Sequence, residues 1–340
     1  MNILQKTRLS KYEVIMLIIM ASVFMTGCTL SAGNGEDEPQ SSVNGIYFDT
    51  FVSISAYDDT PAEVLKGAIG ECEKYEKIFS RTDEESQLYG INNRSAGGAI
   101  CISKDMSRVI AAGLEYGKMT EGRFDIAIGA VTKQWDFHSG GCVVPDGKTI
   151  EDALKHTDAT AISQNDSGLF IDDDKLEMDL GGIAKGYIAD RLKEYLTENG
   201  CTEAVIALGG NIVCIGDKRG QGYSVGVKTP FDNTGKLSKV LNVSDTSVVT
   251  SGVYERYFEK DGQMYHHILD PATGYPARTD LYSVTIVCDD SMKADALTTA
   301  VLIMGEKEGI EYIRERMKDE VSPVKQAVLI NDRYSVTEIN

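Results

Sequence analysis

Apolar residues recur at the spacing of an α-helix in several stretches of the chain. Ile188, Leu192 and Leu196, for example, fall on one face of a helix that begins near residue 185. The stretch at 292–304 is expected to bury a face that contains Leu297 and Val301. The pattern predicts helices at residues 62–79, 106–120, 185–199, 292–304 and 306–318.

Short apolar runs bounded by glycine and polar residues predict strands between these helices. They lie at residues 45–57, 169–171, 204–208, 223–227, 247–250, 283–288 and 327–330. Between residues 204 and 227, strands follow one another with no helix between them, which argues against a doubly wound parallel sheet. The expected fold is α+β, a single compact domain with mixed or antiparallel sheets flanked by helices.

The first 28 residues read as a targeting segment. A basic stretch at residues 6–11 precedes an apolar run at 14–24, which is too short to span a bilayer, and Gly27-Cys28 follows. This order resembles a lipoprotein signal with lipidation at Cys28. The alternative is an ordinary secretory signal with a chance cysteine.

The signal predicts an extracytoplasmic protein that is lipid-anchored to the cell membrane. A polar stretch rich in glycine and serine follows Cys28 and has the composition of a flexible tether. We detect no repeat and no second linker beyond it. The predicted organisation is a signal peptide at 1–27, a tether at 28–44 and one domain at 45–340.

Composition and charge narrow the class of function. The chain has 340 residues with 42% hydrophobic and 25% charged content, which excludes disordered, collagen-like and disulfide-scaffold proteins. A net charge of -18 repels phosphate backbones, so nucleic acid is not an expected partner. A small anionic ligand would need a local positive centre or a bridging cation.

The six cysteines after Cys28 are scattered and include no C-x-x-C pair. Their spacing indicates neither a disulfide framework nor a zinc site. Cys214 and Cys288 lie in apolar runs, where buried free thiols are expected. None of the six is assigned to chemistry.

Residues 179–186, Asp-Leu-Gly-Gly-Ile-Ala-Lys-Gly, predict a strand, a glycine turn and the start of a helix. Glycines allow close approach to a ligand, the first helical turn offers free N–H groups to an anion, and Lys185 adds a positive charge. The alternative is a packing turn with a solvated lysine.

Two further segments contain turns. Gly209-Gly210 predicts either a hairpin turn or a ligand-binding turn. His266 and His267 are adjacent, so in an extended segment one of them faces a site while the other faces away. An imidazole beside the following Asp270-Pro271 turn could serve as a general base, or the segment could be a turn alone.

Asp295 and Thr299 are four residues apart in a predicted helix, so their side chains share a face. Two hard oxygen donors suit Mg²⁺, which keeps several waters. The alternative is a capping aspartate, with the threonine bonded to a backbone carbonyl.

In their order and in their residues, these segments resemble the ApbE family of flavin transferases from residue 49 to about residue 305. The matching segments are Gly122-Arg123-Phe124-Asp125 with Gly129 and Trp135, Asp179 to Gly186, Gly209-Gly210, Thr250-Ser251-Gly252, His267 to Pro271 with Thr273-Gly274, and Asp295 with Thr299. Two positions depart from the family pattern. Phe48-Asp49-Thr50 replaces Met-Gly-Thr, and Val253 replaces an acidic residue.

The resemblance implies transfer of FMN from FAD to a threonine or serine hydroxyl of a target protein, with release of AMP. It implies Mg²⁺, with Mn²⁺ as the alternative, on Asp295, Thr299 and a backbone oxygen of Gly182, with His267 as the base. The positions it implies for flavin nucleotide contacts are Phe124, Asp125, Asp179, Lys185 and Ile268.

The implied acceptor is an extracytoplasmic FMN-binding-domain protein of an electron-transfer system. Alternative functions are hydrolysis of FAD to FMN and AMP, non-catalytic flavin binding, and solute binding for a transporter.

Overall fold

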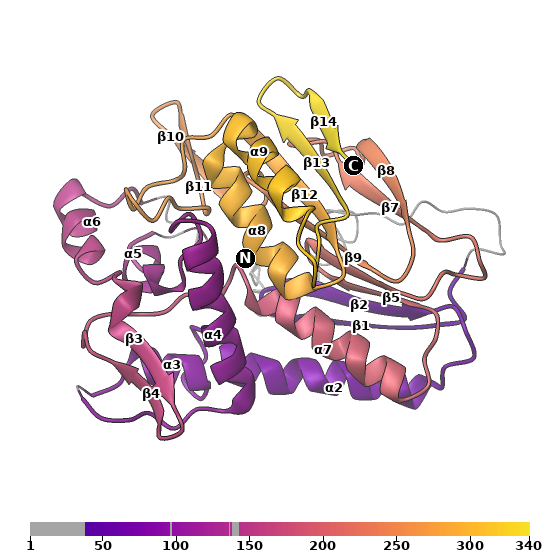
Figure 1. The fold of residues 1–340 in the computed structure, drawn as a ribbon, viewed down its shortest axis with the longest axis horizontal. Coiled ribbons are helices and arrows are strands. Elements are labelled where there is room, and N and C mark those ends of the chain that lie inside the picture. Colours follow the sequence, from indigo (N-terminus) through magenta and orange to yellow (C-terminus); the bar gives the residue numbers. More distant parts are fainter. Residues whose placement is uncertain (1–37, 96, 136, 138–142) are drawn as a thin grey trace, which may run out of the picture.

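The computed structural model describes residues 38–340, apart from residues 96, 136 and 138–142 (Figure 1). The predicted signal peptide, Cys28 and most of the predicted tether therefore lie outside the described residues. Within the described part of the chain, no helix has both the length and the apolar character needed to cross a bilayer.

An antiparallel sheet of eight strands forms the centre of the described structure. In spatial order it contains β1 (Ser41–Tyr47), β2 (Thr50–Ala56), β5 (Ala204–Leu208), β6 (Asn211–Ile215), β9 (Ser247–Gly252), β12 (Leu281–Cys288), β13 (Gln326–Asn331) and β14 (Val336–Ile339). Both faces of the sheet are covered. Neighbouring Val205 and Ile206 accordingly belong to two different hydrophobic clusters.

Helices cover one face of the sheet (Figure 1). They are α2 (Ala62–Phe79), α7 (Ala184–Glu198), α8 (Ser291–Met304) and α9 (Glu306–Arg316). The predicted buried face of α8 is confirmed, since Leu297 and Val301 are fully buried, but burial extends further: α8 packs against α7, α9, β9 and β12 and is buried on nearly every side. Its polar residues, including Asp295, are therefore held inside the protein.

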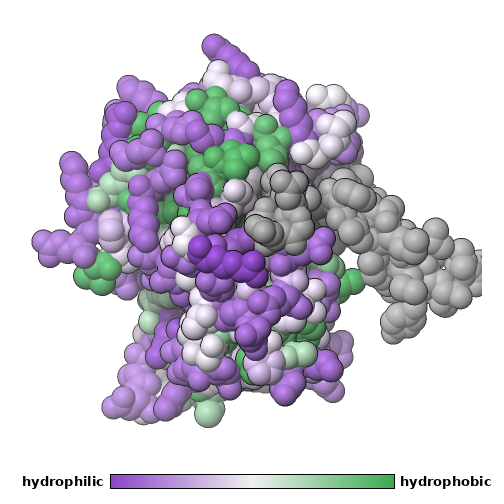
Figure 2. All heavy atoms as spheres, turned by 90° about the vertical axis from the view of Figure 1, so that its right-hand side faces the viewer, coloured by the Kyte–Doolittle hydropathy of each residue, from purple (hydrophilic) through white to green (hydrophobic). Residues whose placement is uncertain are grey.

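A hairpin of β7 (Tyr223–Lys228) and β8 (Leu237–Val243) covers the opposite face of the sheet. Tyr223, Val225 and Leu241 pack there against Val248 and Ile330. Figure 2 views the molecule from the right-hand side of Figure 1, where β7 and β8 lie, and shows hydrophobic residues gathered in the upper half of that face.

A smaller helical region lies beside these layers and is drawn on the left of Figure 1. It contains α3 (Gln87–Asn92), α4 (Lys104–Met119), η1 (Ile126–Ile128), α5 (Gly129–Thr132), α6 (Gly147–Leu154), η2 (Ala159–Ala161), β3 (Ile162–Asn165) and β4 (Gly168–Ile171). A hairpin of β10 (Tyr257–Lys260) and β11 (Gln263–His266) joins it through a cluster that includes Trp135, Phe258 and Leu269. The indole N–H of Trp135 donates to the Gly274 carbonyl at 2.9 Å.

The α+β prediction is confirmed, and the predicted helices match α2, α4, α7, α8 and α9 to within a few residues. The single strand predicted at 45–57 is wrong. Phe48 and Asp49 adopt φ angles of 56° and 55° and form a two-residue turn between β1 and β2. Because β1 begins at Ser41, the folded domain starts before residue 45.

The strand predicted before the glycine turn is also wrong, because β4 ends at Ile171 and residues 176–180 belong to no strand. The segment is extended but bonds to the region around η1 instead of to a sheet. The Asp179 amide donates to the Ile126 carbonyl, and the Gly129 amide donates to the Glu177 carbonyl. These bonds bring the segments that contain Phe124, Asp125 and Asp179 to one place.

Candidate active site

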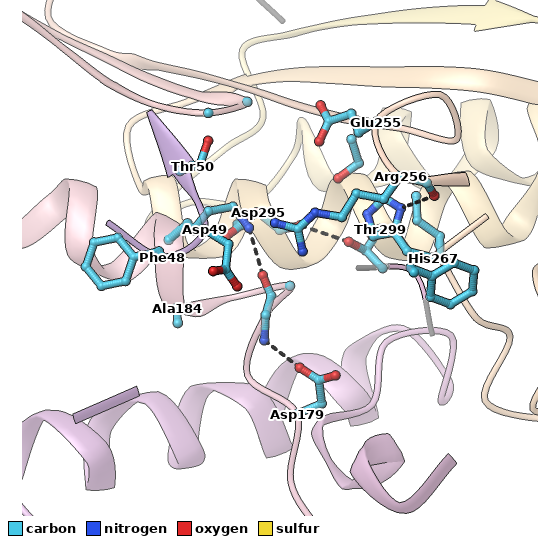
Figure 3. A pocket seen from close by; sticks show the side chains of 18 of the residues that line it. Phe48, Asp49, Thr50, Asp179, Ala184, Glu255, Arg256, His267, Asp295 and Thr299 are labelled. Atoms are coloured by element: carbon cyan, nitrogen blue, oxygen red, sulfur yellow. Dashed lines mark hydrogen bonds between the residues drawn. The ribbon is translucent and has the colours of Figure 1, made fainter. Parts of the chain in front are cut away.

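A cavity of about 1110 Å³ lies between the helical region and the central sheet. Residues from all four chemically distinctive segments line it, including Gly182, Lys185, Gly210, His267 and Asp295. Its volume lies slightly above the ~300–1,000 Å³ range typical of small-molecule sites, so it can hold a large ligand. In Figure 3, Glu255 lies at one end of the view and Asp179 at the other.

Asp295 and Thr299 project from α8 into this cavity, as the spacing predicts. The Asp295 Oδ2 atom accepts a hydrogen bond from the Gly186 amide at 2.9 Å, which joins α8 to the start of α7. A Cβ atom on Gly182 would lie 3.5 Å from the Thr299 Oγ1 atom. The tertiary structure thus brings the three predicted metal-binding positions together.

The capping alternative for Asp295 is wrong, because Asp290 caps α8 by accepting from the Lys293 amide at 2.7 Å. Thr299 does approach the Asp295 carbonyl, but at 3.5 Å. Burial raises the pKa of Asp295, and the nearby charge of Lys185 opposes that shift. A buried carboxylate of this kind is stabilised when a cation lies beside it.

The donors around Asp295 fit a hard cation such as Mg²⁺. Among the described residues, no group of three or more His, Cys, Asp or Glu could hold a metal ion. A site here would therefore combine one carboxylate with the Thr299 hydroxyl and backbone oxygens. Such a sparse oxygen set suits Mg²⁺, which keeps several waters, better than it suits Zn²⁺.

The helix start at Ala184 offers fewer free N–H groups than the sequence predicts. The amides of Ile183 and Ala184 donate to the Leu180 carbonyl, and the Gly186 amide donates to Asp295. A Cβ atom on Gly186 would lie 2.3 Å from the Ser291 carbonyl oxygen. This glycine therefore permits close packing of α7 on α8, as the packing alternative proposes.

Lys185 lies in the cavity wall, and its Nζ atom donates to the Gly181 carbonyl at 2.9 Å. Its positive charge opposes the rise that burial causes in the pKa values of Asp295 and Glu255, and it adds to the lowering of the pKa of His267. The predicted positive centre is therefore present, although the side chain is folded back onto its own turn.

The two adjacent histidines have opposite environments, as predicted. His266 ends β11, is 4% exposed, and its Nε2 atom lies 3.2 Å from the Ala277 carbonyl. Burial lowers the pKa of His266 to about 4. His267 lines the cavity instead.

His267 is held in one tautomer by the backbone of Arg256. Its amide donates to the Arg256 carbonyl at 3.0 Å, and its Nδ1 atom lies 3.3 Å from the same oxygen. Because a carbonyl can only accept, Nδ1 carries the hydrogen and Nε2 keeps its lone pair. Burial, with the charge of Arg256, lowers the pKa of His267 to about 3, so the ring is neutral at neutral pH.

The remaining predicted contact residues also line the cavity. The Phe124 ring lies beside Gly182, because a Cβ atom there would be 3.1 Å from Phe124 Cε2. Asp125 caps η1 by accepting from the Ala127 amide at 2.8 Å, and burial raises its pKa to about 6. The Ile268 carbonyl accepts from the Ala277 amide at 3.0 Å, so its backbone is fixed.

Asp179 is paired with a residue that the sequence did not reveal. Arg81 Nη1 lies 2.5 Å from Asp179 Oδ2, and the Gly181 amide donates to Asp179 Oδ1 at 2.9 Å. Burial alone would raise the pKa of Asp179, but the Arg81 charge and these hydrogen bonds hold it below its usual range. Arg81 is 98 residues away in sequence and belongs to no motif, so sequence reasoning had no means of finding it.

Glu255 and Arg256, to which the sequence assigns no role, both line the cavity. Burial raises the pKa of Glu255, and the charges of Lys185 and Arg256 oppose that shift. Their position shortly after the apolar strand predicted at 247–250 was the available signal for a role at the site. Cys214 and Cys288 are buried free thiols, as predicted.

Comparison with known proteins identifies the family. The sequence profile of the ApbE family matches residues 48–322. A curated relative from Klebsiella pneumoniae (strain 342), named FAD:protein FMN transferase, is 36% identical over 72% of this chain and 76% of its own. A relative of the same name from Treponema pallidum (strain Nichols) is 32% identical over 78% of this chain and 79% of its own.

Solved structures share the fold. The ApbE protein from Thermotoga maritima superposes with a TM-score of 0.79 at 29% identity, covering 87% of this chain and 96% of that one. Flavin transferase ApbE from Vibrio cholerae superposes with a TM-score of 0.76 at 24% identity, over 88% and 97% of the two chains. With the profile matching most of its length, the chain belongs to the ApbE family.

Proposed function

We propose that this protein transfers the FMN moiety of FAD to a threonine or serine hydroxyl of an acceptor protein and releases AMP. One observation carries the proposal. The lone pair of a neutral His267 Nε2 lies in the same cavity as the Asp295 and Thr299 oxygen donors. The printed name of the Klebsiella and Treponema relatives supports the same reaction.

The reaction balances without any change of oxidation state. The acceptor hydroxyl oxygen forms a bond to the flavin-side phosphorus, and the bond from that phosphorus to the bridging oxygen breaks. His267 Nε2 takes the hydroxyl proton, and AMP leaves with the bridging oxygen. Because Nδ1 is tied to the Arg256 carbonyl, Nε2 is the ring nitrogen left to take the proton.

The other cavity residues hold the substrate. Lys185 lies beside Asp295 and supplies positive charge for the phosphates. Phe124 and Ile268 offer apolar surface to the flavin ring, since both are buried and line the cavity. A storage protein needs no base, so the placement of His267 favours catalysis over non-catalytic flavin binding.

Mg²⁺, or Mn²⁺ in its place, would be held by Asp295, Thr299 and the backbone oxygen of Gly182. When bound, the ion would neutralise the pyrophosphate and stabilise the departing AMP. The chain itself supplies the preorganisation, because Gly186 fixes the Asp295 carboxylate through its amide.

The test is incubation with FAD, Mg²⁺ and an FMN-binding domain from an extracytoplasmic electron-transfer protein. Intact mass of the acceptor and release of AMP are measured together. A gain of one FMN unit with equal release of AMP supports transfer. AMP and free FMN without labelling of the acceptor would establish hydrolysis, and retention of intact FAD would establish storage; either result contradicts the proposal.

The predicted lipid anchor forms a second part of the proposal. Lipidation of Cys28 would hold the domain at the outer surface of the membrane, where an extracytoplasmic acceptor is available. Cys28→Ser should release the protein from membranes, because the apolar run at 14–24 is too short for stable anchoring without the lipid. The measurement is membrane fractionation in the source cell. Equal membrane retention of the variant would favour another mode of attachment.

A further inference from the structure

A second, shallower groove of about 520 Å³ opens beside the active-site cavity. It lies between the loop at 229–232, the start of β8 and the start of β14. Thr229, Phe231 and Asp232 line both spaces, so the groove continues the cavity outward. A ligand in the groove could therefore extend into the cavity.

Aromatic side chains form the boundary between the two spaces. Phe231 meets Tyr257 and Tyr282 edge-to-face, with ring centroids 5.4 Å and 5.0 Å apart. Tyr282 in turn meets Tyr334 at 5.4 Å. Tyr257 and Tyr334 are 43% and 50% exposed, and Val336 is 39% exposed. The groove thus presents the Tyr334 ring and the Val336 side chain to solvent next to the cavity mouth.

Two strand edges flank the groove. In the described sheets, β14 is the last strand of the eight and β8 pairs with β7. A salt bridge of 2.8 Å between Lys239 and Glu338 joins these two strands. Strand edges with unpaired backbone groups can pair with an extended peptide, while neighbouring pockets receive its side chains.

We propose that this groove binds an extended segment of the acceptor protein next to its reactive serine or threonine. This inference rests on the proposed function. The acceptor hydroxyl has to reach His267 while most of its protein remains outside, and the groove is the continuation of the cavity through Phe231. An apolar residue flanking the hydroxyl would lie against Tyr334 and Val336.

Two variants test the groove without touching the cavity. Tyr334→Asn removes the ring and keeps a residue that tolerates the φ of 60° found there. Val336→Asp places a charge on the apolar wall. Val321→Asp is the matched control, because Val321 is 98% exposed and lies in neither lining. Each variant is first checked for parental thermal stability.

The assay measures FMN transfer to the acceptor domain described above, and its inhibition by the same domain with the reactive hydroxyl residue changed to valine or alanine. For both groove variants, the acceptor KM and the inhibition constant should rise about tenfold, which corresponds to losing one side-chain contact at a binding hot spot. The kcat, the KM for FAD and the Val321→Asp control should stay near parental values.

Several outcomes overturn the inference. Parental acceptor KM in both groove variants would show that the acceptor binds elsewhere. A dimeric parent that becomes monomeric in Val336→Asp would assign the groove to a second copy of the chain, and loss of binding to anionic vesicles would assign it to a membrane. If the parent transfers no FMN, the proposed function fails and the docking inference fails with it. If the parent transfers FMN and both groove variants keep its acceptor KM, the proposed function is supported and the docking inference is contradicted.

Discussion

The floor of the cavity and its rim are built in different ways. The floor, made by Gly182, Asp295 and Thr299, lies where α7 packs on α8, and the Asp295 carboxylate is 4% exposed and fixed by a backbone amide. The rim, made by Phe231 and Tyr257 and continued into the groove by Tyr334, is held by contacts between aromatic rings, and Tyr257 and Tyr334 are 43% and 50% exposed. Rigid backbone contacts position groups for chemistry, whereas exposed apolar surface suits recognition of a large partner.

Removing the Asp295 carboxylate from the floor should have the largest effect on transfer. Asp295→Ala should lower FMN transfer on the order of a thousandfold, or about 4 kcal/mol of barrier, because the proposed cation would lose its one carboxylate ligand. Asp295→Asn keeps an acceptor for the Gly186 amide and should be nearly as inactive. Steady-state transfer with saturating Mg²⁺ measures both variants.

Asp290→Ala is the control for this prediction, because it removes an aspartate from the same helix. It should cost about 1 kcal/mol of stability through loss of the helix cap and leave transfer near parental. Rapid transfer by Asp295→Ala in the presence of a chelator would refute the metal assignment.

Replacing His267 tests whether this residue is the proposed base. His267→Ala should lower transfer about a hundredfold or more, with the affinity for FAD little changed. His266→Gln should lower it far less, because His266 faces away from the cavity. Single-turnover transfer and FAD titration measure the two effects. Greater damage from the His266 change would reverse the assignment.

The pH dependence of transfer tests the protonation state of His267. A lowered pKa means that His267 becomes protonated only near pH 3, so the ring remains an available base throughout pH 5–8. The parental rate should therefore lack an acid limb near the ordinary histidine pKa of about 6.5. A limb at that pH that disappears in His267→Ala would show that substrate binding restores the ordinary value.

Glycine substitution tests the rigidity of the floor. A Cβ atom on Gly186 would lie 2.3 Å from the Ser291 carbonyl oxygen and 2.7 Å from the Met292 Cα atom, both backbone. Gly186→Ala should therefore force α7 and α8 apart and lower the free energy of unfolding by about 2–3 kcal/mol. Gly70→Ala in α2 meets no atom within 4 Å and should be neutral or stabilising. Urea unfolding compares them, and equal stabilities would mean that the helices yield easily.

The last prediction concerns the pH dependence of stability that the buried His266 produces. The pKa of His266 is about 4 in the folded state, against about 6.5 when unfolded, so between these values the unfolded chain binds the additional proton. Its contribution to stability is complete above pH 6.5 and is lost as the pH falls towards 4, at up to about 1.4 kcal/mol per pH unit. In His266→Gln, which keeps a donor for the Ala277 carbonyl, this part of the slope should disappear. Urea unfolding at pH 5, 6 and 7 measures the difference, and identical slopes would contradict it.

The helices and the Asp295–Thr299 pair were predictable because both depend on spacing within one helix. The hairpin turn at Phe48-Asp49 was missed, because neither residue is a glycine and yet both adopt positive φ. Residues 176–180 were also mispredicted, because their backbone bonds to a distant segment and not to a sheet. Local patterns cannot distinguish these cases, since the bonding partner decides them.

The sequence was enough to predict the helices, the adjacent histidines with opposite orientations, and the candidate groups for binding a metal and accepting a proton. These follow from periodicity and residue chemistry, which act over a few positions. The tertiary structure alone decided that Arg81 pairs with Asp179, that the Gly186 amide fixes Asp295, and that Phe231 joins the cavity to an outer groove. Each of these depends on contacts between residues far apart in the chain, which form only when the helices pack on the sheet.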